Sequence, residues 1–192
     1  MPSSAPRRFV LLDRDGTINV ERNYLSDPDQ LALYPGVGPA LRRLSDLGFG
    51  IAVVTNQSGI ARGYFDLAQL ERVHERLRAL LAEFGVTIDG IFCCPHAPDA
   101  GCDCRKPLPG MIEQAVAALG FDPKQAFMVG DKAIDVELGQ GVGAKSILVR
   151  TGYGHEQEAN CAADAVVDDL PAAVAWIERS VGTAKAAERL EQ

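Results

Sequence analysis

The sequence contains no apolar run long enough to cross a membrane. One of its longer apolar stretches, residues 49–54, falls far short of the ~20 residues that a spanning helix needs. Only four apolar residues separate Arg8 from Asp13 near the amino terminus, too few for the core of a secretory signal. We therefore expect a cytoplasmic protein that does not associate with membranes.

Basic charge is also scarce. The chain has 19 Lys and Arg against 26 Asp and Glu, a formal net charge of −7. An acidic protein repels a phosphate backbone at long range, so we expect no nucleic-acid partner, although a small anionic substrate can still find a local basic pocket. There is no internal repeat, and 192 residues fit one domain, expected over residues 1–182 with a frayed tail over 183–192. We expect a monomer.

Short apolar runs alternate with stretches of helical periodicity. The runs are rich in Val and Ile, as in strands buried on both faces, and span residues 9–12, 51–54, 91–93, 127–129, 147–149 and, at an edge, 165–167. The helical stretches span residues 37–47, 67–84, 111–119, 133–140 and 171–179. This order predicts an α/β fold with a doubly wound, mostly parallel sheet. In the second helical stretch, His74 has charged neighbours and is expected at the surface.

Residues that can carry chemistry follow successive predicted strands. Asp13 and Asp15 come after the first strand, Thr55 after the second, Lys106 after the third and its loop, and Asp131 after the fourth. In such a sheet, ligands bind at the carboxyl ends of the strands. Two carboxylates this close repel each other unless a cation lies between them or one of them is protonated, and Mg²⁺ would remove the repulsion. Taken singly, each residue also has a structural explanation, as a turn, cap or surface residue.

Four of the five cysteines fall within twelve positions of the chain. Cys94 and His96 lie at the end of the third predicted strand, and Cys102 and Cys104 follow a short loop. Three thiolates and one imidazole match the ligand set of a tetrahedral, structural zinc site. A chance cluster or a redox pair is the alternative. Zinc at this place would pin the loop that carries Lys106.

The joint pattern resembles the haloacid dehalogenase superfamily of phosphatases. Its four motifs are matched by Asp13-x-Asp15-Gly16-Thr17, by Thr55, by Lys106 and by Gly130-Asp131-x-x-x-Asp135. The resemblance implies a Rossmann-like sheet with a minimal cap or none, and catalysis through an aspartyl-phosphate. By that resemblance Asp13 is the nucleophile and Asp15 the general acid and base, while Thr55 and Lys106 stabilise the phosphoryl group. Mg²⁺ would be bound by Asp13, Asp131 and the main-chain carbonyl of Asp15.

Within this superfamily, the sequence is most similar to a zinc-loop group that removes the C7 phosphate of D-glycero-D-manno-heptose 1,7-bisphosphate, in nucleotide-heptose and lipopolysaccharide core biosynthesis. The positions that would bind the substrate are Glu21, Arg22, Asn23, Tyr24, Asn56, Gln57, Ser58, Arg105 and Lys132. A bisphosphate needs cations beyond the catalytic lysine, and Arg105 and Lys132 supply them. Histidinol-phosphate phosphatase is the alternative, because Glu21 would suit the amine of that substrate.

Two other classes of function remain open from the sequence. A phospho-receiver signalling module is also doubly wound and also uses Asp, Thr and Lys with Mg²⁺. Its phosphate-accepting Asp follows a later strand, whereas Asp13 follows the first predicted strand and has a second carboxylate two residues on. A zinc-dependent interaction module with an inactive pocket is the other possibility. The sequence favours a phosphomonoester hydrolase that acts on a sugar bisphosphate.

Overall fold

Six parallel strands form a single sheet in the order β3-β2-β1-β4-β5-β6. The computed structural model describes residues 6–190, with side chains described through Gly182. The strands are β1 (Phe9–Leu12), β2 (Gly50–Asn56), β3 (Gly90–Cys94), β4 (Phe127–Gly130), β5 (Lys145–Val149) and β6 (Ala165–Val167). The predicted parallel sheet is confirmed, and its sixth strand lies at the edge as expected. One shared sheet also supports the single domain over residues 1–182, which stays a prediction.

Helices connect the strands in the predicted order. The longer ones are α1 (Val37–Asp46), α2 (Leu67–Ala82), α3 (Gly110–Leu119), α4 (Ala133–Gly141) and α6 (Leu170–Leu190). The sequence did not predict the short α5 (Gly154–Gln157) or the 3₁₀ turns at Pro28–Gln30, Pro123–Gln125 and Glu158–Asn160, because three or four residues show no period. The last helix continues beyond its expected end at Arg179. The expected frayed tail, residues 183–192, begins where the described side chains end, and it stays a prediction.

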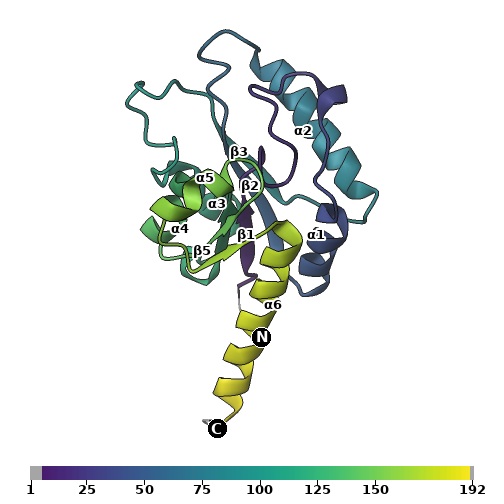
Figure 1. The fold of residues 1–192 in the computed structure, drawn as a ribbon, viewed down its shortest axis with the longest axis vertical. Coiled ribbons are helices and arrows are strands. Elements are labelled where there is room, and N and C mark those ends of the chain that lie inside the picture. Colours follow the sequence, from purple (N-terminus) through teal and green to yellow (C-terminus); the bar gives the residue numbers. More distant parts are fainter. Residues whose placement is uncertain (1–5, 191–192) are drawn as a thin grey trace.

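The helices cover both faces of the sheet (Figure 1). Along β1, Val10 and Leu12 belong to the core beneath α1, α2 and α6, whereas Phe9 and Leu11 belong to the core beneath α3 and α4. Alternate residues of a strand point to opposite faces, so a strand covered on both sides must be apolar throughout. This double burial explains the short, continuous apolar runs in the sequence.

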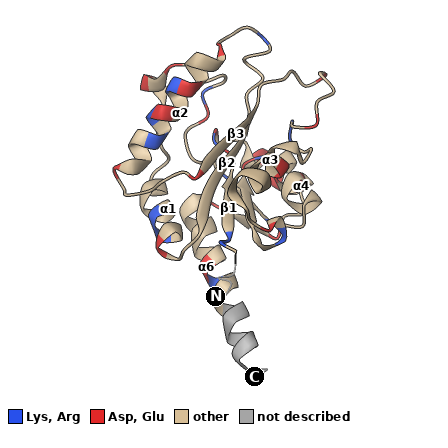
Figure 2. Cartoon of the chain, turned by 180° about the vertical axis from the view of Figure 1, so that it is seen from behind, with Lys and Arg blue, Asp and Glu red and all other residues tan. Residues whose placement is uncertain are grey.

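Charged residues are concentrated outside the sheet. Figure 2 shows Lys, Arg, Asp and Glu along α1, α2 and the connecting loops, while the strands are almost free of them. Among the described residues, the structure contains no helix that is both long enough and apolar enough to span a membrane.

The expectation that His74 lies at the surface was wrong. Its residue exposure is only 3%. His74 is one turn beyond Leu70 and one turn before Leu77, both buried, so it belongs to the stripe that α2 packs against the sheet. Burial, followed by the positive charge of Arg14, lowers the pKa of His74 to about 4 even though Glu71 lies beside it.

Candidate active site

The predicted catalytic residues meet in one pocket at the carboxyl edge of the sheet. Asp13, Asp15, Thr55 and Lys106 all line a cavity of about 300 Å³. Eight of the nine predicted substrate-binding residues line it too, namely Glu21, Asn23, Tyr24, Asn56, Gln57, Ser58, Arg105 and Lys132. The exception is Arg22, which is exposed and is not among the lining residues. The order of the strands therefore brings together predicted residues that are up to 119 positions apart, from Asp13 to Lys132.

Lys106 lies buried between two carboxylates. Its Nζ donates to Asp13 Oδ1 at 2.6 Å and to the carbonyl of Val54 at 2.9 Å, and lies 2.7 Å from Asp135 Oδ1. Burial acts to lower the pKa of Lys106, but the adjacent charges of Asp13 and Asp135 raise it above its usual value. Lys106 is therefore a fixed cation at the side of Asp13, where a phosphoryl group would need one.

Asp15 accepts hydrogen bonds from four donors. Arg14 donates from Nε to Oδ1 at 3.2 Å and from Nη2 to Oδ2 at 2.7 Å. Asn19 Nδ2 and Gln57 Nε2 complete the set at 2.9 and 3.0 Å. Burial works to raise the pKa of Asp15, but the guanidinium of Arg14 and these hydrogen bonds outweigh it and lower the pKa below its usual value. The carboxylate that would exchange the proton is thus held in place from three sides.

Asp131 is fully buried and has a side-chain oxygen, Oδ1, without a hydrogen-bond partner. Its other oxygen accepts from the main-chain N–H of Tyr153 at 2.9 Å. Burial, with the charge of Asp13 added, raises the pKa of Asp131 to about 8. A buried carboxylate that resists ionisation next to a second carboxylate is a site that a divalent cation stabilises.

Oxygens of Asp13, Asp131 and Asp135 lie within 4.8 Å of one another, so the cluster fits a hard, oxygen-preferring ion such as Mg²⁺. Asp135 is the least available of the three, because its oxygens already face Lys106 Nζ and the main-chain N–H of Lys132. The side chain of Asp15 points to Arg14 instead, so only its main chain is left for the expected metal contact. That contact stays a prediction.

Two of the predicted substrate contacts make internal hydrogen bonds. Asn56 accepts from the main-chain N–H of Lys106 at 3.1 Å and donates to its carbonyl at 3.4 Å. Gln57 Nε2 bridges Asp15 Oδ2 and Thr55 Oγ1, each at 3.0 Å. The amide of Asn56 thus connects the loop of Lys106 to the end of β2, and the amide of Gln57 connects Asp15 to Thr55. Sequence alone did not separate this role from substrate binding.

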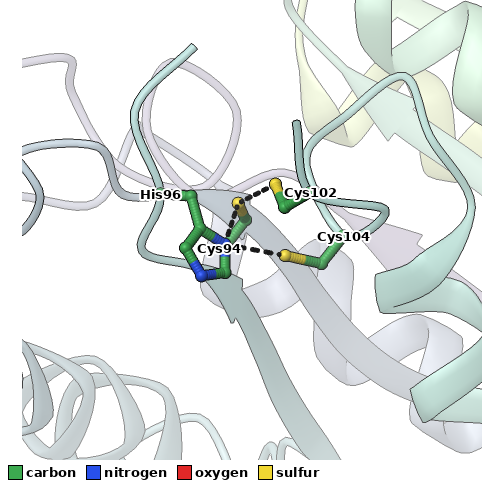
Figure 3. A group of neighbouring side chains, drawn as sticks. All are labelled: Cys94, His96, Cys102 and Cys104. Atoms are coloured by element: carbon green, nitrogen blue, oxygen red, sulfur yellow. Dashed lines mark hydrogen bonds between the residues drawn. The ribbon is translucent and has the colours of Figure 1, made fainter. Parts of the chain in front are cut away.

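The four predicted zinc ligands form a compact cluster, shown in Figure 3. Cys94 Sγ lies 3.6 Å from His96 Nδ1 and 3.7 Å from Cys102 Sγ, and His96 Nδ1 lies 3.2 Å from Cys104 Sγ. Ligand atoms on a tetrahedral zinc ion are separated by roughly 3.5–3.8 Å, from Zn–S and Zn–N bonds of about 2.3 and 2.0–2.1 Å. The two distances from Cys94 lie in this range and the distance from His96 to Cys104 is shorter, so the four side chains are already gathered closely enough to bind one zinc ion.

The acidities of these thiols also favour a cation. Burial and the neighbouring thiols raise the pKa of Cys104 to about 12. Cys102 is different: burial acts against its ionisation, but the main-chain N–H of Arg105 and the adjacent side chains lower its pKa to about 7. Three thiolates cannot coexist at such distances unless a positive ion offsets their charge.

The cations expected for a second phosphate are present at the pocket. Arg105 lies next to the cysteine cluster, where its Nη1 donates to the carbonyl of His96 at 3.4 Å. Lys132 Nζ lies 3.6 Å from Glu21 Oε2 and 4.0 Å from Asp131 Oδ1. Burial acts to lower the pKa of Lys132, and the charges of Asp131 and other nearby carboxylates raise it above its usual value.

Sequence reasoning missed two residues that line the pocket, Ile134 and Tyr153. Tyr153 lies after β5, a strand end for which we identified no motif. Its ring lies under the ammonium of Lys132, 4.7 Å from Nζ to the ring centroid. The available signal was its place: it follows the carboxyl end of a fifth parallel strand, the same edge from which the other site residues come.

Comparison with known proteins agrees with this site. A family model described as HAD-hydrolase-like matches residues 103–173. The D-glycero-beta-D-manno-heptose-1,7-bisphosphate 7-phosphatase of Haemophilus ducreyi is 42% identical over 179 residues, covering 89% of this chain and 98% of the relative. The Escherichia coli protein of the same name is 45% identical over 186 residues, with 91% and 96% covered.

Solved structures give the same family. The D,D-heptose 1,7-bisphosphate phosphatase of B. bronchiseptica, solved with magnesium and phosphate, superimposes with a TM-score of 0.84 at 36% identity, covering 90% of this chain and 99% of that one. The predicted resemblance to haloacid dehalogenase phosphatases is confirmed. The chain belongs to the D-glycero-β-D-manno-heptose-1,7-bisphosphate 7-phosphatase family of haloacid dehalogenase-like hydrolases.

Proposed function

We propose that this protein removes the C7 phosphate of D-glycero-β-D-manno-heptose 1,7-bisphosphate, in nucleotide-heptose and lipopolysaccharide core biosynthesis. The observation that carries the proposal is the buried pair of Asp13 and Lys106, 2.6 Å apart, at the base of a pocket whose wall carries further cations. The names of the relatives supply the substrate and its β anomer.

In the proposed reaction Asp13 attacks the phosphorus atom of the C7 phosphate. A P–O bond to Asp13 forms while the bond to the sugar oxygen breaks. The anionic phosphate beside Asp15 would raise the pKa of that carboxyl, so that Asp15 is protonated in the complex and passes its proton to the sugar oxygen. Asp15 then takes a proton from a water molecule, whose oxygen attacks the aspartyl-phosphate. Phosphate leaves and free Asp13 is restored. Lys106 and Thr55 would offset the charge on the phosphoryl oxygens in both steps.

Mg²⁺ would be held by Asp13, Asp131 and the main-chain carbonyl of Asp15. The partnerless buried oxygen of Asp131 supports this assignment. When bound, the ion would lower the repulsion between an anionic nucleophile and an anionic substrate. Asp135, already paired with Lys106 at 2.7 Å, would hold the lysine rather than the metal.

Zn²⁺ would be held by Cys94, His96, Cys102 and Cys104, with no position left for water, which makes its role structural. The next two residues after the last ligand are Arg105 and Lys106. Zinc would therefore fix the start of the segment that brings both cations to the phosphate. A reducing compartment keeps three such thiols available, which supports a cytoplasmic location.

The pocket favours a sugar bisphosphate over histidinol phosphate. Glu21, the carboxylate that would suit an amine, is already paired with Lys132 at 3.6 Å. Arg105 and Lys132 line the same pocket as cations beyond Lys106, and a second phosphate would offer Lys132 more negative charge than the single carboxylate of Glu21 does. The proposed partner is thus a small phosphorylated sugar. The pocket is lined by described residues of a single chain, and we propose that the protein is a monomer.

Steady-state turnover with Mg²⁺ tests the proposal. We expect the heptose bisphosphate to exceed fructose 1,6-bisphosphate and histidinol phosphate in kcat/KM by tenfold or more, about 1.4 kcal/mol in transition-state binding. Asp13→Asn should fold and lose turnover. A tenfold preference for histidinol phosphate would show that the proposed substrate is wrong. A long-lived phosphoprotein without phosphate release would instead support a receiver module.

A further inference from the structure

Tyr153 belongs to a closed set of four side chains along one wall of the pocket. Its hydroxyl donates to Asn23 Oδ1 at 3.3 Å, and its ring carries Lys132 Nζ at 4.7 Å from the centroid. Lys132 Nζ in turn lies 3.6 Å from Glu21 Oε2, and Glu21 Oε1 accepts from the main-chain N–H of Asn23 at 2.8 Å. The set joins three loops that are far apart in the sequence.

The segment that Tyr153 contacts has an unusual backbone. Asn23 and Tyr24 are the only described non-glycine residues with positive φ, at 47° and 63°. Asparagine tolerates this region, but a tyrosine there is a conformational outlier that surrounding contacts must maintain. An isolated loop would lack the contacts that Tyr153 and Lys132 make to Asn23 and Glu21, and those that Tyr64 and Arg62 make to Tyr24. Tyr24 lines the pocket, and Tyr153 supports this segment at the preceding residue, Asn23.

We propose that Tyr153 is a positioning residue for the part of the substrate beyond the reacting phosphate. Its hydroxyl holds Asn23, and its ring places Lys132 toward the pocket. The inference rests on the proposed function only in requiring a substrate that is larger than its scissile phosphate group. It assigns to the loop after β5 a role in selecting the substrate.

The side chain of Tyr153 is separate from the reacting groups. Asp13 pairs with Lys106, which also contacts Asp135 and the carbonyl of Val54. The Tyr153 side chain instead contacts Asn23 and Lys132. Only the main-chain N–H of Tyr153 reaches a predicted metal ligand, Asp131, and every substitution except proline keeps that group. Loss of the hydroxyl should therefore weaken binding of an extended substrate more than it slows chemistry.

The test compares Tyr153→Phe with the wild type on two substrates. One is whichever of the heptose and fructose bisphosphates the wild type hydrolyses better, and the other is p-nitrophenyl phosphate. We expect KM for the sugar bisphosphate to rise about fivefold, in the range for one lost hydrogen bond, with kcat changed less than twofold. Turnover of p-nitrophenyl phosphate should stay within twofold. Tyr64→Phe, which keeps the ring that packs on Tyr24 at 4.8 Å, is the matched control and should behave as wild type.

A double-mutant cycle shows whether the hydroxyl acts through Asn23. Asn23→Gly keeps the positive φ accessible and removes the acceptor, so adding Tyr153→Phe to it should raise KM no further. Unchanged KM in Tyr153→Phe, equal losses on both substrates, or fully additive effects would each overturn the proposal. If the wild type prefers fructose bisphosphate, the proposed substrate fails while the test of Tyr153 still stands.

Discussion

Arg14 donates two hydrogen bonds to the carboxylate of Asp15, its neighbour in the chain, from Nε to Oδ1 at 3.2 Å and from Nη2 to Oδ2 at 2.7 Å. Arg14 has no exposed surface, and its remaining nitrogen, Nη1, has no partner. Burying a guanidinium costs free energy, so the two-bond contact of Arg14 with one carboxylate is a feature that the site depends on. It fixes the direction in which Asp15 faces the pocket.

Replacing Arg14 by methionine should therefore slow catalysis. Met fills a similar volume, but Asp15 keeps only its bonds from Asn19 and Gln57, so we expect kcat to fall about tenfold or more while KM changes little. Arg14→Lys keeps the charge without the two-bond contact and should recover part of the loss. Steady-state kinetics check this, with unfolding curves to confirm that the variants fold. Wild-type turnover in folded Arg14→Met would show that the two-bond contact is dispensable.

A second prediction concerns Gly16, which packs against the buried metal-site carboxylate. A Cβ at Gly16 would collide with Asp131 Oδ2, and its φ is +86°. Gly16→Ala should therefore displace Asp131 and weaken Mg²⁺ binding by at least about tenfold. Asp131 would no longer be placed to bind the ion, and alanine disfavours this positive φ. Isothermal titration with Mg²⁺ and the Mg²⁺ dependence of turnover measure the effect.

Gly48→Ala is the matched control for that prediction. Gly48 has nearly the same φ, +85°, but an added Cβ would have nothing within 4 Å. It should lose about 1–2 kcal/mol of stability from the backbone alone and leave Mg²⁺ binding unchanged. Equal Mg²⁺ affinities in the two variants would contradict the role assigned to the contact with Asp131.

The sequence was sufficient to predict the main framework of the site. Asp13, Thr55 and Asp131 each end a buried parallel strand, and parallel strands place their carboxyl ends at one edge, so their meeting follows from the order of the elements alone. The cysteine cluster was equally predictable, because ligands two residues apart on each side of a short loop can reach one ion. Both inferences need only topology and spacing.

Roles that depend on side-chain direction were not predictable. Asn56 and Gln57 follow a strand end as substrate-binding residues would, yet their amides bond Lys106, Asp15 and Thr55. Tyr153 carried no signal except its position after β5. His74 was the avoidable error, because its spacing from Leu70 and Leu77 already placed it on the buried stripe of α2. Charged neighbours in sequence were a poorer guide than helical period.

Removal of one zinc ligand gives a third prediction. Cys102→Ser should lose zinc and lose most turnover, because Arg105 and Lys106 follow Cys104 directly, while far-UV circular dichroism shows the sheet intact. Metal analysis and steady-state kinetics check it. Cys161→Ser, a substitution of a free thiol outside the cluster, should keep both zinc and activity. A variant of Cys102 that is free of zinc but fully active would show that zinc does not hold the cationic loop.

His74 should make the protein less stable in mild acid. Its folded-state pKa of about 4 lies below the ordinary value of 6.5, so the unfolded chain binds the extra proton between these values and the free energy of unfolding falls as pH decreases. The loss is about 1.4 kcal/mol per pH unit within that window. His74→Leu removes the titrating group together with its partnerless Nε2. Relative to the wild type, this variant should therefore gain about 1.4 kcal/mol between pH 7.5 and 5.5.

Urea unfolding at the two pH values measures that gain, because contributions from all other groups cancel in the difference between variant and wild type. His155→Leu removes an exposed imidazole and should leave the pH dependence as it is in the wild type. If His74→Leu and the wild type lose stability in parallel as the pH falls, the imidazole is not held neutral by burial and Arg14. In that case Glu71, whose carboxylate lies 3.5 Å from the imidazole, offsets the charge of protonated His74 even inside the core.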